Sequence, residues 1–184
     1  MPGMTATEKV LTPEKFADAF SGLFEAEAFR VERLAEYDDD PGTRDLVARH
    51  AAGEDVAGEG RDGWLALVRD AADAGRVIAR VHVVGEMTPY LDYELASYEV
   101  NAAAGETIAI LPEGDADRLG VPPVDFWLFD RATVAVIDYD ERGAPRAIIV
   151  TDDPVRAAGA RQVRDLAVRH AIPLGDYKAG RKAA

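Results

Sequence analysis

Apolar residues recur along much of the chain at spacings of three or four, which predicts helices. The clearest helix starts are Thr12-Pro13, Thr88-Pro89 and Asp153-Pro154, where a capping residue precedes a proline at the first helical position. Together with two weaker patterns, these starts predict helices over about 13–26, 43–51, 64–75, 89–104 and 154–170.

Strands are predicted where β-branched and apolar residues alternate or run together. The predicted strands cover 29–34, 77–84, 107–111, 125–130, 133–139 and 146–151. Residues 77–84 are mostly apolar, which suits a central strand covered on both faces. Asp140 to Gly143 is a hairpin signal between the last two strands. The segment 112–123 holds three Pro and two Gly, and predicts a loop.

Strands and helices interleave irregularly, and the last strands form a meander. This order predicts an α+β fold in a single domain, with a mixed β-sheet and helices packed on its faces. We expect the domain to span 12–177, between a flexible tail at 1–11 and a basic flexible tail at 178–184. Both faces of DFWLFD at 125–130 are apolar, so Trp127 is expected in the core. Asp125 and Asp130 are expected to cap nearby backbone N–H groups.

The charge and the composition exclude several classes of function. The 184 residues carry 21 Lys+Arg and 34 Asp+Glu, a net charge of −13, which disfavours direct nucleic-acid binding because phosphate is repelled. The chain has no Cys, which excludes disulfides, iron–sulfur clusters, thiolate catalysis and Cys-based zinc sites. No segment has the pattern of a signal peptide or approaches about 18 uninterrupted apolar residues. We therefore expect a cytoplasmic protein without a membrane span.

Sequence motifs of catalysis, nucleotide binding and metal binding are absent. The chain has no H-E-x-x-H, no G-x-S-x-G, no P-loop and no G-x-G-x-x-G. Its three His do not form a cluster. The sequence therefore assigns no catalytic residue, no metal site and no cofactor.

Several segments resemble an actinobacterial family of unknown function. They are RVHVVGEMTPYLDYE at 80–94, Asn101, Gly105-Glu106, DFWLFD at 125–130 and the ending Ala171-Ile172-Pro173-Leu174. DFWLFD is the most specific of them, and the resemblance covers about 12–177. Members usually carry Arg where this chain has His82. Because members often lie beside helix-turn-helix regulators, the resemblance implies a regulatory role with such a regulator as partner.

A second resemblance concerns residues 123–174, which are similar to one half of a phospholipase D-like domain. That superfamily carries the motif H-x-K-x4-D. Counting back from Asp130, the His position holds Pro123 and the Lys position holds Asp125. Without an imidazole nucleophile or a phosphate-binding Lys the reaction cannot run. The resemblance therefore implies a degenerate half-domain with a retained fold and a lost active site.

The predicted helix 89–104 carries a polar stripe beside its apolar one. The apolar stripe runs from Leu91 to Ala102 and should pack against the core. The second stripe consists of hydrogen-bonding side chains at the same spacing: Tyr90, Glu94, Ser97 and Asn101. Two interpretations stay open, a pocket lining that binds a polar ligand and a solvated helix face.

Three charged residues lie within or just beyond predicted strands and helices. Arg80 lies in an otherwise apolar strand, where a charge is costly unless it is paired. It either pairs structurally with Glu94 or Glu86, or holds the carboxylate or phosphate of a ligand. Glu86 and Glu106 follow a strand and a helix, where acid–base and metal-binding side chains are often placed.

The candidate binding residues belong to the polar stripe and to these charged positions: Arg80, Glu86, Tyr90, Glu94, Ser97, Asn101 and Glu106. The favoured hypothesis is a non-catalytic regulatory domain that binds a small polar ligand or a protein partner. The alternative is a small enzyme in which Glu94 and Tyr90 form an acid–base pair and Arg80 holds an anionic substrate.

Basic residues concentrate near the C-terminal end of the sequence. Residues 154–184 hold seven Lys+Arg and two acids, a net charge of +5. We expect Arg161, Arg164 and Arg169 to point outward from the last predicted helix. They either form a docking patch for an acidic partner or pair with the acidic body of the domain.

Overall fold

The chain forms one mixed β-sheet in the computed structural model, which describes residues 6–37 and 42–182. Within these residues, eight strands lie in the order β1-β7-β6-β5-β2-β3-β4-β8. β2, β3 and β4 run parallel to one another, and the other neighbouring strands are antiparallel. The strands are β1 (Glu8–Leu11), β2 (Glu27–Glu32), β3 (Val77–Val84), β4 (Thr107–Pro112), β5 (Phe126–Phe129), β6 (Thr133–Tyr139), β7 (Pro145–Thr151) and β8 (Ile172–Pro173).

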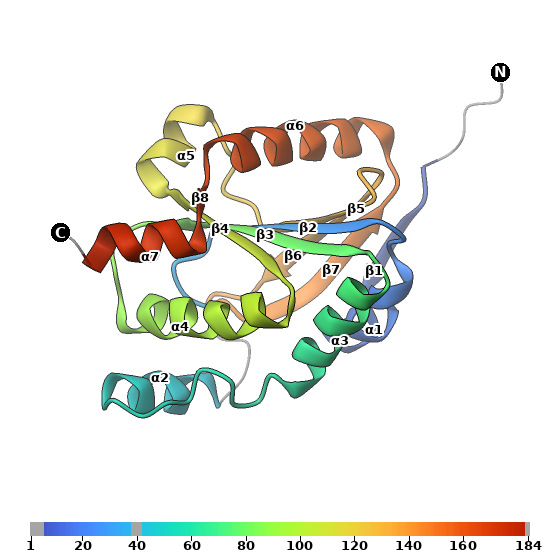
Figure 1. Cartoon of the computed structure of the whole chain (residues 1–184). Helices are drawn as coiled ribbons and strands as arrows, with labels where there is room; N and C mark the ends of the chain where they lie inside the picture. Colours follow the sequence, from blue (N-terminus) through green and yellow to red (C-terminus); the bar gives the residue numbers. More distant parts are fainter. Residues whose placement is uncertain (1–5, 38–41, 183–184) are drawn as a thin grey trace, which may run out of the picture.

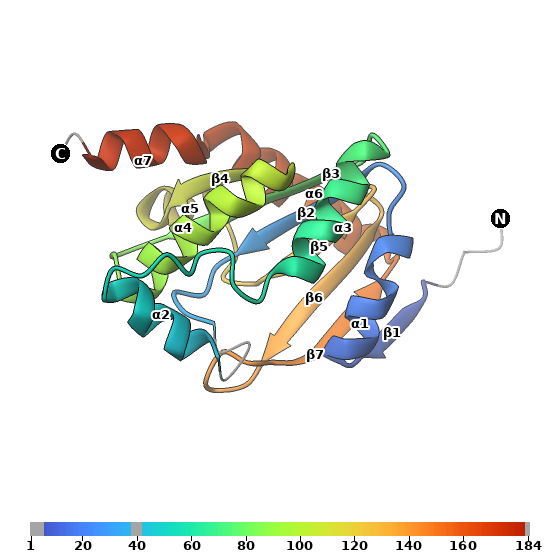
Figure 2. The ribbon, with the colours of Figure 1, turned by 60° about the horizontal axis from the view of Figure 1, so that its bottom comes forward.

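Helices cover both faces of the sheet (Figure 1). α5 and α6 lie over one face, and α1, α3 and α4 lie over the other, which Figure 2 brings forward. α2 packs on the outer side of α4. The helices are α1 (Pro13–Ala19), which continues as a 3-10 turn over Phe20–Gly22, α2 (Thr43–Ala51), α3 (Asp62–Asp73), α4 (Pro89–Ala104), α5 (Glu113–Leu119), α6 (Pro154–His170) and α7 (Leu174–Lys182). The α+β fold with a mixed sheet is confirmed.

The two long helices begin as the sequence predicts. The Thr88 hydroxyl accepts a hydrogen bond from the backbone N–H of Leu91 at 3.2 Å, and α4 ends at Gly105 with φ of +118°. Asp153 caps α6 by accepting from two backbone N–H groups of its first turn, at 2.8 and 3.0 Å. The predicted hairpin also forms. In its turn, the carboxylate of Asp140 accepts hydrogen bonds from the backbone N–H groups of Arg142 and Ala144.

α4 is enclosed on several sides, because α2 and α3 pack against it and the sheet lies beneath it. The four residues of its polar stripe are all buried, with exposures between 0% and 8%. The interpretation of this stripe as a solvated face is therefore wrong. The physical reason is that α2 and α3 cover the side of α4 that faces away from the sheet, and the sequence of α4 alone does not indicate this covering.

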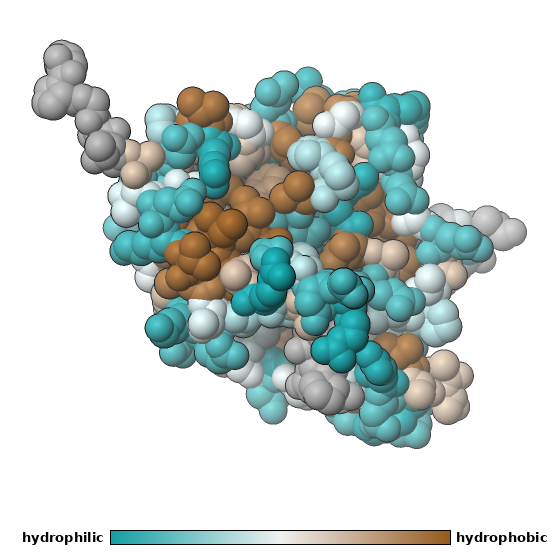
Figure 3. Space-filling model, turned by 180° about the vertical axis from the view of Figure 1, so that it is seen from behind, coloured by the Kyte–Doolittle hydropathy of each residue, from teal (hydrophilic) through white to brown (hydrophobic). Residues whose placement is uncertain are grey.

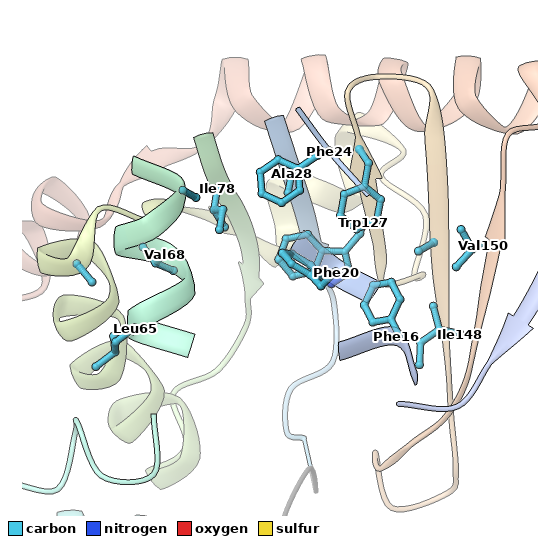
Figure 4. Close-up of a cluster of buried hydrophobic side chains, with 14 residues drawn as sticks. Phe16, Phe20, Phe24, Ala28, Leu65, Val68, Ile78, Trp127, Ile148 and Val150 are labelled. Atoms are coloured by element: carbon cyan, nitrogen blue, oxygen red, sulfur yellow. The ribbon is translucent and has the colours of Figure 1, made fainter. Parts of the chain in front are cut away.

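An aromatic cluster fills the space between the sheet and α1 (Figure 4). Phe16, Phe20 and Phe24 come from α1 and the turns after it, and pack against Trp127 and Phe129 of β5. The Phe20 and Trp127 rings meet edge to face, with centroids 4.8 Å apart. Trp127 is only 4% exposed, as predicted for a core residue.

The two aspartates that flank β5 hold neighbouring backbone, as predicted. Asp130 accepts hydrogen bonds from the N–H groups of Glu25, Ala26 and Glu27 at 2.7–2.8 Å. Asp125 accepts from the N–H of Arg33 at 2.7 Å. The two carboxylates therefore fix both ends of β2 to β5.

Four predicted segments differ from the structure. Residues 8–11, expected in a tail, form β1 and pair with β7, because a four-residue strand is too short to show a pattern. The C-terminal tail expected from 178 lies in α7 as far as residue 182, anchored by the buried Leu174. Residues 113–119 form α5 instead of a loop, since Pro112 precedes the helix and Gly120 ends it. The first helix stops at Ala19, not at 26.

Apolar side chains gather on the back of the molecule (Figure 3). A shallow groove of about 730 Å³ lies between α6 and strands β5, β6 and β7, with Val124, Val136 and Ile149 in its lining. At its rim Arg156 pairs with Glu8 of β1 at 3.1 Å. None of the described helices is long and apolar enough to cross a membrane.

Candidate functional site

Three side chains that lie side by side in the sheet form the floor of a pocket. In the register of β2 with its two neighbours, Arg30 lies opposite both Arg80 of β3 and Trp127 of β5. Trp127 packs with side chains of α1 and α3, and Arg80 lies over the ring of Trp64 of α3, so the three side chains point to the face that carries α1, α3 and α4 (Figure 2). Phe29 and Val31, on either side of Arg30, enter the core on the opposite face.

The pocket above this floor has a volume of about 240 Å³. Its walls come from β2, β3 and β5, from the start of α2, from the beginning of α3 and from the first half of α4. It is lined by guanidinium groups, carboxylates and aromatic rings: Arg30, Glu32, Tyr37, Thr43, Arg61, Trp64, Arg80, Tyr90, Tyr93, Glu94 and Trp127. Drug-sized ligands occupy pockets of roughly 300–1,000 Å³, so this one suits a smaller molecule.

Glu32 is the centre of a buried ionic network. Both of its oxygens lie 3.1 Å from Nη1 of Arg80, and Oε1 lies 3.1 Å from Nη2 of Arg30. The Tyr98 hydroxyl donates to Oε2 at 2.6 Å. Burial alone would raise the pKa of Glu32, but the charges of Arg30 and Arg80 outweigh it and hold the pKa well below its usual range. Glu32 is therefore ionised at neutral pH.

Glu106 binds the other side of Arg80. Nε of Arg80 donates to Oε1 of Glu106 at 2.5 Å, and the indole N–H of Trp64 donates to Oε2 at 2.9 Å. Burial would lower the pKa of Arg80, but Glu106 and Glu32 raise it well above its ordinary value. The guanidinium stays charged and is held between two carboxylates of the protein itself.

Asp125 joins the network from the loop before β5. One of its oxygens accepts from the hydroxyl groups of Tyr37 and Tyr139, at 2.6 and 3.0 Å. Burial, together with nearby carboxylates, raises the pKa of both phenols above their usual value. Both tyrosines thus keep their protons and act as donors, with Arg30 3.9 Å from the same carboxylate.

His82 is fully buried beside Glu32 and belongs to a chain of hydrogen bonds. Its Nδ1 lies 2.8 Å from the Tyr98 hydroxyl, and its Nε2 lies 3.4 Å from the carbonyl oxygen of Leu34. Because the single hydroxyl proton of Tyr98 goes to Glu32, Nδ1 of His82 is the donor to Tyr98. His82 therefore supports the network from behind, and it does not line the pocket.

An ion pair closes one wall of the pocket. Nη2 of Arg61, which precedes α3, donates to Oε2 of Glu94 on α4 at 3.1 Å. The guanidinium also lies 5.8 Å from the ring centroid of Tyr93. Burial would lower the pKa of Arg61, but Glu94 and Tyr93 raise it. This pair is less buried than the Glu32 network, with side-chain exposures of 21% and 11%.

The seven candidate residues from the sequence occupy three different situations. Arg80, Tyr90 and Glu94 line the pocket, and Glu106 holds Arg80 from outside it. Ser97 and Asn101 are completely buried further along α4, and their side-chain polar atoms have no hydrogen-bond partner among the described residues. Glu86 is exposed and is not part of the pocket lining.

The predicted partners of Arg80 are wrong, although its predicted pairing as a buried ion is correct. Its partners are Glu32 and Glu106, and neither Glu94 nor Glu86. The physical reason is the position of β2, which lies beside β3 and brings Glu32 next to Arg80. A contact between strands so far apart in sequence has no local signature.

Sequence reasoning missed eight residues that line the pocket: Arg30, Glu32, Tyr37, Thr43, Arg61, Trp64, Tyr93 and Trp127, the last of which was predicted only as a core residue. A signal existed for the first two, because Arg30 and Glu32 alternate with Phe29 and Val31 and must share one face of the strand. That face looks like a solvent face until the helices above it are known. No comparable signal marked Arg61, which lies just before its helix.

Within the described residues, no group of three or more His, Cys, Asp and Glu side chains is placed to hold a metal ion.

Comparison with known proteins places the chain in a family without giving it an activity. No curated protein matches the chain in sequence. A solved structure similar to it is NucT from Helicobacter pylori, with a TM-score of 0.48 and 9% identity over 92% of this chain and 99% of that chain. A likeness of this size is too small to carry a functional argument. The family described as Domain of unknown function (DUF6879) matches residues 14–179, and the chain therefore belongs to the DUF6879 family.

Proposed function

We propose that this chain is a non-catalytic regulatory domain that binds a small polar ligand in the pocket beside α4. The observation that supports this most directly is the pocket itself, where three arginines, two tryptophans and two glutamates surround a space of about 240 Å³. Pockets with a few fixed polar groups among aromatic rings are typical ligand sites.

The protein's own contacts hold the floor of this pocket in place. Arg30 and Arg80 are held by Glu32, and their guanidinium groups lie over aromatic rings, Arg30 over Trp127 at 5.5 Å and Arg80 over Trp64 at 5.8 Å. Such preorganisation reduces the loss of side-chain freedom on binding.

The alternative, an enzyme that uses Glu94 and Tyr90 with Arg80 as substrate holder, has weaker support. Tyr90 and Glu94 do line the pocket. However, the carboxylate of Glu94 is already paired with Arg61. An ion pair of this kind favours the charged form of a carboxylate, which suits a binding role better than proton transfer.

The regulatory part of the proposal rests on the resemblance to proteins that lie beside helix-turn-helix regulators. In this proposal, ligand binding changes the affinity of the domain for such a regulator. The degenerate H-x-K-x4-D positions, Pro123 and Asp125, fit a domain that has no phosphodiesterase activity. No direct contact with nucleic acid is proposed, given the net charge of −13.

The test is affinity capture of the tagged protein from its own host, followed by identification of bound small molecules and proteins. A matched pair of variants controls it. Arg61→Gln changes the pocket wall, whereas Arg49→Gln changes a partly exposed arginine that pairs with Glu54 and Glu59 outside the pocket. We expect one small molecule with the parent and with Arg49→Gln, and less of it with Arg61→Gln. Equal amounts with both variants, or no bound small molecule at all, would contradict the proposal.

A further inference from the structure

We infer that the ligand of this pocket is a small organic anion, a carboxylate or a phosphate carried on a planar body. This inference rests on the proposed function, since it names the ligand class of the same site. It follows from the hydrogen-bonding capacity that the protein's own contacts leave unused.

The carboxylates below the pocket are already occupied by donors. Glu32 accepts from Arg80 and Tyr98 and contacts Arg30, and Glu106 accepts from Arg80 and from the Trp64 indole. Asp125 is likewise taken up by two tyrosine hydroxyls and a backbone N–H. None of these three carboxylates needs a donor from a ligand.

The arginines, in contrast, have donors to spare. In Arg30, only Nη2 contacts other described residues by hydrogen bond or ion pair, and in Arg80 only Nε and Nη1 do. Nη1 of Arg30 and Nη2 of Arg80 are not among the buried polar atoms that lack a partner, so both have accessible surface. Both residues line the pocket and lie opposite each other in the sheet register. Neighbouring guanidinium groups with free N–H donors are well suited to a carboxylate or phosphate.

Glu94 is the group that opposes such a ligand. It lines the pocket, and among the described residues only Arg61 binds it, through Oε2. Its charge would repel an anion at the spare donors, while its pairing with Arg61 reduces this repulsion. Three arginines and two glutamates line the pocket. Glu106, Asp125 and His82 are buried behind these lining residues. A variant at Glu94 therefore separates an anion from a cation by the sign of its effect.

The aromatic walls favour a planar body for the anion. The ring centroids of Trp64 and Trp127 lie 6.0 Å apart at an interplanar angle of 56°, and Tyr90 and Tyr93 face the same space. Aromatic walls of this kind bind flat apolar groups by burial and by edge-to-face contact. Trp64 and Trp127 are the only tryptophans of the chain, and both line the pocket, so intrinsic tryptophan fluorescence responds to binding there.

The experiment titrates the full chain with four probes of nearly equal shape: benzoate, phenyl phosphate, benzamide and benzylammonium, followed by tryptophan fluorescence. We expect benzoate or phenyl phosphate to bind about tenfold or more tightly than benzamide, with benzylammonium weakest. The benzoate and phenyl phosphate arms decide between carboxylate and phosphate. We expect Glu94→Gln to tighten anion binding several-fold, Arg61→Gln to weaken it, and Arg49→Gln to leave it unchanged.

The outcomes separate this inference from the proposed function. If benzamide or benzylammonium binds most tightly, or if Glu94→Gln weakens anion binding, the inference of an anionic ligand is wrong. The proposed function of ligand binding in this pocket would still hold. If no probe binds, the molecule captured from the host decides, since an anionic one supports the inference and any other overturns it. If no probe binds and no small molecule is captured, both the inference and the proposed function fall.

Discussion

The two ends of strand β2 each carry a glutamate paired with arginine, and the two pairs are in very different surroundings. Glu27, at the start, is bound by Nε of Arg164 from α6 at 2.8 Å, where both side chains keep about a fifth of their exposure (20% and 19%). Glu32, at the end, is bound by Arg80 with side-chain exposures of 4% and 6%. Both are glutamate–arginine pairs, but Glu32 is more deeply buried and has Arg30 and Tyr98 as further partners.

This difference teaches where a charge costs stability and where it does not. The Glu27 pair is only partly buried, so water still reaches both ions and salt screens them in part. The Glu32 pair has lost its water, so each ion depends on its protein partners. A buried network of this kind is poor evidence of stability, and its position beneath the pocket suits a binding role better.

The largest expected effect comes from Arg80→Met. It leaves Glu32 and Glu106 buried with fewer donors, so we expect a loss of about 3–5 kcal/mol in the free energy of unfolding. Urea denaturation followed by circular dichroism measures it, and a variant that is already unfolded without urea counts as the same result. An unchanged midpoint would show that the two ends of β2 do not differ as described.

Tyr98→Phe should have the next largest effect. It removes the donor that lies 2.6 Å from Glu32 and the acceptor for His82, without changing the ring that packs against the core. A hydrogen bond to a charged group contributes about 1.5–3 kcal/mol, which is the loss we expect in the same urea experiment. A double variant with Glu32→Gln serves as control, since the loss from Tyr98→Phe should shrink when the charge is gone.

The pH dependence of stability tests Glu32 directly. Its pKa in the folded protein lies below the unfolded value of about 4.3, so its stabilisation is complete above that pH and is lost as the pH falls below it. Glu32→Gln should therefore be less stable at pH 7 and lose less stability on acidification. Asp165, whose pKa the exposed Arg131 lowers to about 2, acts in the same direction in both proteins and cancels in the comparison. Parallel pH curves for the two proteins would contradict the assignment.

Arg164→Met should have the smallest effect, about 1 kcal/mol, because water still reaches its ion pair with Glu27 and such pairs contribute little. Arg164 also contacts Asp165 at 3.0 Å, and that pair is screened in the same way. At about 1 M salt the difference from the parent should vanish. The loss from Arg80→Met should persist at the same salt concentration, and its disappearance there would remove the distinction between the two ends.

The sequence predicts the strands and helices well where the signal is local. The starts of α4 and α6 follow from a cap and a proline, and β3 and β6 have their predicted bounds. β1 and α5 were missed because short elements on the surface draw their stability from neighbours, β7 for β1 and the β4 side of the sheet for α5. Propensity alone does not decide such segments.

The pocket was predictable only in part, for a related reason. The polar stripe of α4 pointed to Tyr90 and Glu94, and the charge in an apolar strand pointed to Arg80. Which residues they meet depends on strand order, and nothing near Arg80 in the sequence indicates Glu32 as its partner. Of the α6 arginines expected to point outward, Arg164 pairs with Glu27 and Asp165, Arg161 donates to the carbonyl oxygen of Arg131, and Arg169 is exposed. Whether they also dock a partner stays a prediction.

The strand order also determines when the sheet can form while the chain is being synthesised. β2 lies between β3 and β5, so the floor of the pocket is incomplete until Trp127 has left the ribosome, long after Arg30. β1 waits longer still, for β7. Domains form as units during synthesis from the N-terminus, and pairings between distant segments form slowly. A nascent chain arrested before Phe126 should therefore be digested quickly by protease, whereas the released 184-residue chain should resist digestion.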